Sequence, residues 1–296
     1  MLGLGLSLFT GGSLRPYYAV VAAAFKDRVE ADGGTVESMS CLKADLKVLN
    51  PIKPPPFDED YQAILDEASS LGYTAPSAAQ QTLQNTLVED LKTAGIWSKL
   101  DALYIMANDG SSDFGRLNWA SPSTFALSEV SSPTFTSNEG FTGNGSSSTL
   151  DTGINMGVNT TQFNQSTLNG SFGGWSYNTK TPSGQALMGD LLDVNNLRGG
   201  SADSIFGERA GSSTLVSGLY HMNADGTDSV QYINGSQVTS ASLGPLQTTT
   251  NTMHLLSEGG TTAFSTDTIS IFFIGGDLSA EASDLYNAFN TYMSAL

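Results

Sequence analysis

The sequence predicts an α+β fold, in which an N-terminal helical segment is followed by an antiparallel β-sandwich with a C-terminal helix. Only 14% of the 296 residues are charged, against roughly 25% in average soluble proteins, and 32 are glycine, which suits turns and exposed sheet faces. Apolar residues recur at helical spacing up to about residue 100, and short apolar segments between turn residues follow. The sequence therefore predicts a helical region over 1–100 and a sandwich over 101–296.

Charge and cysteine content exclude several classes of protein. The net charge of −17 repels phosphates, so neither nucleic acid nor an anionic membrane is an expected partner. The one cysteine, Cys41, excludes an intramolecular disulfide, and two histidines leave little for a His-based metal centre. The apolar run Met1–Phe9 has no basic residue before it and is far shorter than the ~20 residues that span a bilayer. We therefore expect neither a signal peptide of the usual form nor a transmembrane helix.

Two helices are predicted ahead of a stiff proline-rich connector at 51–56. Gly33 and Gly34 separate them, because glycine readily adopts the left-handed conformation that ends a helix. Each helix has one narrow apolar stripe, which must be covered by the rest of the chain or by a neighbouring subunit. We expect this region to anchor and assemble the protein through the residues of these stripes: Tyr17, Val21, Phe25, Leu42 and Leu46.

Two further helices are predicted before residue 100. The first follows an acidic run at 58–60, which suits the positive end of a helix dipole, and Gly72 closes it. The second begins with Ser77 and Gln80 in capping-box spacing, and Gly95 ends it. Their apolar stripes are Tyr61, Ile64, Leu65 and Ala68 in the first, and Leu83, Leu87 and Leu91 in the second.

The region after residue 100 reads as short strands separated by turns. The clearest hairpin lies at 229–240, where Asn234-Gly235 favours a tight turn because both positions accept a positive φ. In the segment 268–274, Ile269, Ile271 and Phe273 alternate with residues that are partly polar and partly apolar. This alternation predicts one wholly apolar face. A terminal helix over 279–295 is predicted, with Ser279 as its capping residue. The other predicted strands are 101–107, 171–178, 185–192, 218–222 and 252–256.

Several of these segments resemble one family of phage proteins. GFTGNGSSSTLDTG at 140–153 resembles the entry strands of the concanavalin A-like, laminin-G-type jelly rolls of tailed-bacteriophage structural proteins, and QYINGSQV at 231–238 is similar to their hairpin. The ending at 269–293 resembles their closing strand, turn and terminal helix, and FKDRVEADGGTVESMSCL at 25–42 resembles phage helical leaders. The resemblance implies a concanavalin A-like jelly roll, a fold that hosts lectins, glycanases and inert structural modules.

Catalytic patterns are largely missing from the sequence. Glycanases of this fold carry Glu-x-Asp-x-x-Glu on one strand, and no glutamate of the sandwich half has an aspartate two positions on. A carboxylate pair assembled from distant strands, which Asp151 or Asp193 could join, is left open. There is no Gly-x-Ser-x-Gly elbow, and His221 and His254 each lie on a predicted strand, where a structural role is the usual one. We therefore expect a non-enzymatic protein, with a polysaccharide depolymerase as the least favoured alternative.

Two kinds of ligand site are compatible with the residues present. Asn223, Asp225 and Asp228 surround a glycine turn, as in the opening of a calcium loop, although a plain hairpin turn has the same composition. We expect no cofactor other than calcium. For a sugar, aromatic rings would stack on its apolar face beside polar groups; the candidates are Trp119, Trp175, Tyr177, Asn178 and Tyr220, with a core role as the alternative for the tryptophans.

Taken together, the sequence predicts a virion structural protein of a capsid, collar or tail. Its N-terminal helices would contact other virion proteins through their apolar stripes, and its sandwich would project outward. Such appendages are commonly symmetric, so a homo-oligomer is expected. The alternative function is a lectin-like module that binds host or environmental glycans.

Overall fold

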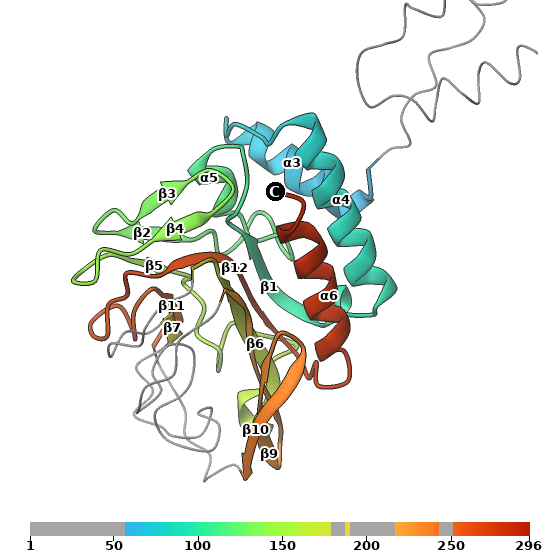
Figure 1. Cartoon of the computed structure of the whole chain (residues 1–296), viewed down its shortest axis with the longest axis vertical. Coiled ribbons are helices and arrows are strands. Elements are labelled where there is room, and N and C mark those ends of the chain that lie inside the picture. Colours follow the sequence, from blue (N-terminus) through green and yellow to red (C-terminus); the bar gives the residue numbers. More distant parts are fainter. Residues whose placement is uncertain (1–56, 179–186, 190–216, 243–250) are drawn as a thin grey trace, which may run out of the picture. The chain divides into compact units, whose positions relative to one another are not determined.

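The structure of the chain is a computed structural model, which describes residues 57–178, 187–189, 217–242 and 251–296 (Figure 1). The chain divides into two compact units, Met1–Pro56 and Phe57–Leu296, and the second is described here by itself. The expected assembly residues therefore lie outside the described residues: Tyr17, Val21, Phe25, Leu42 and Leu46.

A large antiparallel sheet forms the middle of the unit. Its strands follow the order β10-β9-β8-β6-β12-β4-β3, and β1 pairs with β12 beyond the end of β4. Long strands from the two ends of the unit thus meet, since β1 and β12 lie about 170 residues apart in sequence. The strands are β1 (Leu100–Ile105), β3 (Thr134–Thr136), β4 (Gly140–Thr142), β6 (Asn169–Ser176), β8 (Gly218–Asp225), β9 (Asp228–Ile233), β10 (Ser236–Ser242) and β12 (Thr268–Gly275).

A smaller sheet covers one face of the large one. It has the order β2-β5-β11-β7, with strands of two or three residues: β2 (Ser128–Val130), β5 (Thr149–Asp151), β7 (Met188–Gly189) and β11 (His254–Leu255). The core between the two sheets, called the sheet-side core below, includes Phe141, Leu150, Phe172, Leu255 and Phe272. The predicted β-sandwich is confirmed, while the concanavalin A-like strand order stays a prediction.

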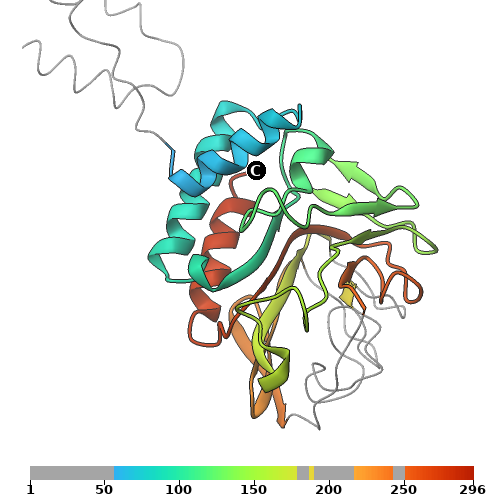
Figure 2. The same cartoon turned by 180° about the vertical axis from the view of Figure 1, so that it is seen from behind.

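Helices cover the opposite face of the large sheet, as both views show (Figures 1 and 2). The core between helices and sheet, called the helix-side core below, includes Ile64, Leu91, Trp119, Phe273 and Phe289. The helices are α3 (Glu59–Ser70), α4 (Ala78–Thr93), α6 (Ala282–Met293) and the short η3 (Trp97–Lys99), α5 (Ser112–Gly115) and η4 (Gln165–Thr167). None of these helices has both the length and the apolar character needed to cross a bilayer.

The boundary between the two compact units lies between Pro56 and Phe57, whereas the sequence predicted a boundary near residue 100. The helices α3 and α4 belong with the sandwich because their apolar stripes are covered by the large sheet and α6. Tyr61, Ile64, Leu87 and Leu91 are all buried in the helix-side core. The change in composition therefore marks a change of secondary structure and does not separate two compact units.

The strand β12 is buried on both faces, because helices lie on one side of it and the small sheet on the other. All eight residues, Thr268–Gly275, are buried. An irregularity in its pairing with β6 falls between Ile269 and Ile271, so Ile269 lies in the sheet-side core and Ile271 in the helix-side core. The predicted single apolar face is therefore wrong, since a strict two-residue period does not continue through a β-bulge.

The predicted starts of three helices and the predicted hairpin turn differ in outcome. Asp58 caps α3 through the amide of Asp60, and Ser77 caps α4 through the amide of Gln80 at 3.3 Å. The predicted start of the last helix at Ser279 is wrong, because α6 begins at Ala282 after a loop. The hairpin is confirmed: β9 and β10 pair around Asn234 (φ 50°) and Gly235 (φ 74°), both in the left-handed region.

Candidate functional site

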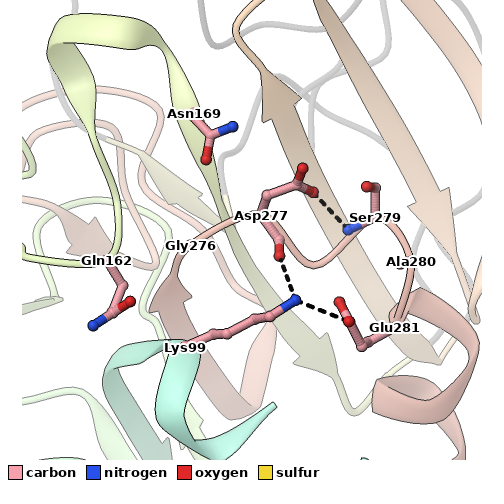
Figure 3. A pocket seen from close by; sticks show the side chains of 8 residues that line it. All are labelled: Lys99, Gln162, Asn169, Gly276, Asp277, Ser279, Ala280 and Glu281. Carbon is pink, nitrogen blue, oxygen red and sulfur yellow. Dashed lines mark hydrogen bonds and ion pairs between the residues drawn. The ribbon is translucent and has the colours of Figure 1, made fainter. Parts of the chain in front are cut away.

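A polar pocket of about 320 Å³ lies where the loop between β12 and α6 meets the sheet (Figure 3). One wall is Lys99 at the end of η3, and another is formed by Gln162 and by Asn169, the first residue of β6. The loop from β12 to α6 supplies the remaining lining residues: Gly276, Asp277, Ser279, Ala280 and Glu281. The site is thus assembled from three segments that are distant in sequence.

The ammonium group of Lys99 closes one side of this pocket. It lies 2.8 Å from Glu281 Oε1 and donates to the backbone carbonyl of Asp277 at 3.2 Å (Figure 3). The Lys99 side chain is 37% exposed and that of Glu281 is 20% exposed, so the pair is open to solvent. Lys99 therefore bridges the two ends of the loop that leads into α6.

The carboxylate of Asp277 is held ionised by its surroundings. Burial would raise its pKa, but hydrogen bonds from Ser279 and Asn223 and the nearby charge of Lys99 outweigh burial, so the pKa lies below its ordinary value. One carboxylate oxygen accepts from the Ser279 amide at 2.9 Å. The pocket accordingly contains two carboxylates, Asp277 and Glu281, and one ammonium group.

Two buried side chains of the sheet fix the loop from behind. Asn223 Oδ1 accepts from the Leu278 amide at 2.9 Å and from the hydroxyl of Ser171, and Ser171 Oγ itself lies 3.1 Å from the same amide. Ser171 and Asn223 face each other across β6 and β8. The loop is therefore attached to the middle of the large sheet and not only to its ends.

The opposite wall is fixed by the carboxylate of Asp101. It accepts from the amides of Thr161, Gln162 and Phe163 at 2.6 to 2.9 Å and from the hydroxyl of Thr161 at 3.0 Å. Three successive amides around one carboxylate form an anion nest. This nest positions the backbone of Gln162 without using its side chain.

The side-chain amides of Gln162 and Asn169 have no hydrogen-bond partner in the part of the chain that the structure describes, although both line the pocket (Figure 3). The backbone of Asn169 exchanges two hydrogen bonds with Asn164. Each amide can donate and accept. The pocket therefore contains two uncommitted amides beside a charged pair, an arrangement suited to binding a hydrogen-bonding ligand.

The aromatic residues expected to stack on a sugar are mostly buried. Trp119 (1% exposed) lies in the helix-side core between Tyr61 and Phe114, and Trp175 (6% exposed) stacks on Tyr286 of α6 with ring centroids 6.1 Å apart. Tyr220 (3% exposed) lies in the sheet-side core. These three side chains are separated and covered, so they form no open platform.

The two remaining sugar candidates lie just beyond the end of β6. Tyr177 is 36% exposed, and the side-chain amide of Asn178 donates to Thr268 Oγ1 at 3.0 Å. Trp175 lies beneath α6 and so does not form a shared surface with Tyr177.

The predicted calcium residues form a hairpin turn between β8 and β9. Asp225 Oδ1 accepts from the amides of Thr227 and Asp228, both at 2.8 Å, and Gly226 has a φ of 88°. Asn223 is buried (1% exposed) and already bonded behind the pocket, whereas Asp225 is exposed. Within the described residues, no three His, Cys, Asp or Glu side chains gather as a metal site would require.

The two histidines have different surroundings. His221 is buried between the rings of Tyr232 and Phe273, and burial lowers its pKa to about 3. His254 pairs across strands with Asp151, whose carboxylate lies 3.7 Å from Nε2, and burial lowers its pKa against the opposing effect of Asp151. The Thr149 hydroxyl lies 3.3 Å from His254 Nδ1, but it is fully buried and donates to the Leu255 carbonyl. Asp151, His254 and Thr149 therefore present no accessible hydroxyl nucleophile.

Comparisons with known proteins give only remote likenesses. No family model matches the chain, and no curated protein does. Among solved structures, a mutant of Trypanosoma rangeli sialidase displaying trans-sialidase activity is 11% identical, with a TM-score of 0.45, over 73% of this chain and 40% of that one. The Trypanosoma rangeli sialidase itself is 13% identical, with a TM-score of 0.41, over 73% and 40%.

A mutant of HCR/D is 10% identical, with a TM-score of 0.39, over 66% of this chain and 53% of that one. This chain thus spans about half or less of the length of each of these structures. At this level of similarity no residue role, substrate or activity is carried over to this chain.

None of the residues that line the pocket was predicted from the sequence as a site residue. Its residues are scattered over 99–281 and form no motif, and Asp277 and Ser279 were interpreted as part of a turn and a helix cap. One signal was present: the Gly275-Gly276 pair directly after an apolar strand indicates a tight loop at the end of that strand. Gly275 has no room for a side chain, because a Cβ there would lie 2.5 Å from the carbonyl of Lys99.

Proposed function

We propose that this chain is a non-enzymatic structural protein of a bacteriophage particle, attached through residues 1–56 and displaying the unit 57–296. The proposal rests on the sequence resemblance to phage virion proteins given above. Other virion proteins and further copies of this chain are the proposed partners, and the virion is the proposed location.

The attachment region that we propose is shorter than residues 1–100, because α3 and α4 are left out of it. Because the apolar stripes of both helices are buried in the unit itself, they cannot also bind a particle. The expected assembly residues at 17–46 all belong to the segment 1–56, and the proposed attachment therefore rests on that segment.

The distribution of charge favours the same assignment. Residues 1–56 carry six Lys and Arg against five Asp and Glu, a net +1, whereas residues 57–296 carry six against 24, a net −18. Like charges repel neighbouring copies of the displayed unit, while the first segment has almost no net charge to oppose close assembly.

Deleting residues 1–56 tests this proposal. Particles assembled in the presence of the truncated chain should lack it, while the full chain should copurify with them at a fixed copy number. Circular dichroism and thermal melting of the truncated chain serve as the folding control. Normal incorporation of a folded 57–296 chain would overturn the proposed attachment.

Saccharide recognition is the second candidate function, favoured by the two uncommitted amides in the pocket at Lys99 and Glu281. It no longer involves Trp119, Trp175 or Tyr220, which are buried. A glycan array probed with the full chain, with and without calcium, tests it. Failure to bind any glycan would remove this candidate and leave the structural role standing.

A further inference from the structure

We infer that the pocket lined by Lys99, Gln162, Asn169, Asp277, Ser279 and Glu281 binds one ring of a neutral saccharide. This inference rests on the second candidate function and gives it a site. It is independent of the proposed assembly role.

Size and lining exclude apolar ligands. The pocket, at about 320 Å³, lies at the small end of the range for ligand sites and has room for a single sugar ring. Ala280 and Gly276 are its only lining residues without a polar side chain. A ligand that fits must therefore replace water by making hydrogen bonds of its own.

The charged groups of the pocket exclude two further classes of ligand, anions and metal ions. An anion would meet the carboxylates of Asp277 and Glu281 in a unit of net charge −18, with one ammonium group already paired. A metal ion would meet Lys99, and the described residues offer no cluster of three ligating side chains there. A neutral ligand with several hydroxyl groups avoids both conflicts, because each hydroxyl can donate to a carboxylate and accept from an amide or from Lys99.

The two amides are groups that a ligand can take over from water, since Gln162 is exposed and Asn169 is half-buried at the pocket. Gln162 and Asn169 direct side chains to the pocket, and neither side chain holds a described part of the fold. The backbone around each is fixed by other groups, namely Asp101 for Gln162 and Asn164 for Asn169. Removing either amide should therefore leave the fold intact while removing a contact to the ligand.

The walls are also rigid before any ligand arrives. Ser171 and Asn223 hold the loop at Leu278 from inside the sheet, and the nest around Asp101 holds 161–163. Little ordering is then required on binding, so polar contacts contribute to affinity without a large entropic loss. No aromatic ring lines the pocket, so affinity in the millimolar range is expected for a single ring.

The experiment measures binding of methyl glycosides of glucose, galactose, mannose and N-acetylglucosamine to the full chain by saturation-transfer-difference NMR and titration. At least one should bind at millimolar concentration. Gln162→Ala and Asn169→Ala should each weaken binding about fivefold, and the double variant about 25-fold, with melting temperatures unchanged. Phosphate and spermidine serve as anionic and cationic probes and should not compete.

The groove between α4 and α6 provides a matched control. It has a similar volume of about 330 Å³ and a polar lining that includes Asp90, Thr93, Asp284 and Asn287. Asn287 is exposed, and Asn287→Ala should leave saccharide binding unchanged. This variant removes the same kind of amide from a different hollow.

Three results would overturn the inference in different ways. Binding that survives the double variant would place the saccharide site elsewhere and leave saccharide recognition standing. Binding lost in Asn287→Ala would assign it to the groove between helices. Absence of binding to all four glycosides and to the glycan array would remove both the pocket site and the second candidate function.

Discussion

The large sheet has two buried faces, and they are covered in different ways. On one face lie the long helices α4 and α6, whose regular stripes meet Ile271 and Phe273 of β12. On the other lie strands of two or three residues and their loops, which meet Phe272 and Ile274. One strand can therefore contribute to two cores, one regular and one irregular, when layers of structure cover both of its faces.

The two faces also satisfy their buried polar groups differently. On the helix face, Tyr61 donates to Gln84, Gln84 to the hydroxyl of Tyr292, and Tyr292 to the carbonyl of Ala107, at 2.7, 3.1 and 2.6 Å. On the sheet face, hydroxyls of Thr149 and Thr152 donate to carbonyls of the adjoining segment, at 2.7 and 2.8 Å. Short strands form few ladder bonds, so side-chain hydroxyls supply additional ones.

The largest expected effect comes from truncating the two adjacent phenylalanines of β12. Phe272 lies 6.1 Å from the ring of Tyr104 in the sheet-side core, and Phe273 lies 6.1 Å from Phe289 of α6; both are fully buried. Each change to alanine should lower the free energy of unfolding by about 3–5 kcal/mol, because a large cavity remains. Urea denaturation measures both.

Hydrogen exchange then separates the two faces. Phe273→Ala should raise exchange mainly in α6, whereas Phe272→Ala should raise it mainly in β5 and β11. Equal exchange patterns in the two variants would mean that the helices and the small sheet unfold together. The two faces would then differ in structure but not in local stability.

The next largest effect concerns pH and the two histidines. His221 on the helix face has a pKa lowered to about 3, so it stays neutral in the folded state while the unfolded chain takes up a proton below about pH 6.5. Stability from this group is therefore present at pH 7 and is lost as pH falls. Between pH 7 and pH 5 the loss should be about 2 kcal/mol.

The variant His221→Phe isolates this contribution. Neither ring nitrogen of His221 has a hydrogen-bond partner among the described residues, so phenylalanine removes the titration without breaking a bond. The variant should lose less stability than the parent between pH 7 and pH 5. For His254, which is partly exposed and lies near Asp151, His254→Gln should change the pH dependence less. A larger effect at His254 would contradict the comparison.

Removing a single hydroxyl group on either face should have a smaller effect on the free energy of unfolding. Tyr292→Phe leaves the Ala107 carbonyl and the Gln84 amide without that partner, and Thr149→Val does the same to the Leu255 carbonyl. Each should cost about 1–1.5 kcal/mol, since a buried polar group loses a hydrogen bond. If Thr149→Val costs nothing, the hydroxyls of the sheet face do not replace ladder bonds in the way argued above.

Much of the fold could be predicted from the sequence, because its longest elements have strong local signals. The stripe of Tyr61 and Ile64, the cap at Ser77 and the turn at Asn234-Gly235 all specify local conformation, and all three are found. The division at residue 57 could not be predicted, because it depends on which elements cover the helices. That is a tertiary property with no local pattern.

The candidate site could not be predicted for a related reason. Lys99 and Glu281 meet only because β1 and β12 pair, so their proximity depends on a contact across most of the chain. Trp175 was predicted as an aromatic residue that could stack on a sugar, but its ring is covered by Tyr286 of α6. Burial by a remote helix is invisible to a two-residue period.

The smallest expected effects are those of two partly exposed basic residues that form ion pairs, Lys99 near the helix face and Arg116 near the sheet face. Lys99, bonded to Glu281 at 2.8 Å, connects η3 to the start of α6. Arg116 contacts Asp113, lies 3.5 Å from Glu129 of β2 and donates to the Leu127 carbonyl at 3.2 Å. Lys99→Met should cost less than about 0.5 kcal/mol and Arg116→Met about 1 kcal/mol, because the guanidinium group makes several directed bonds.

Urea denaturation in low salt and in 1 M NaCl measures both, and salt should reduce the difference between each variant and the parent. A loss above about 2 kcal/mol in Lys99→Met would mean that this lysine holds α6 against the sheet, and the helix face would then depend on a surface charge more than on its apolar core.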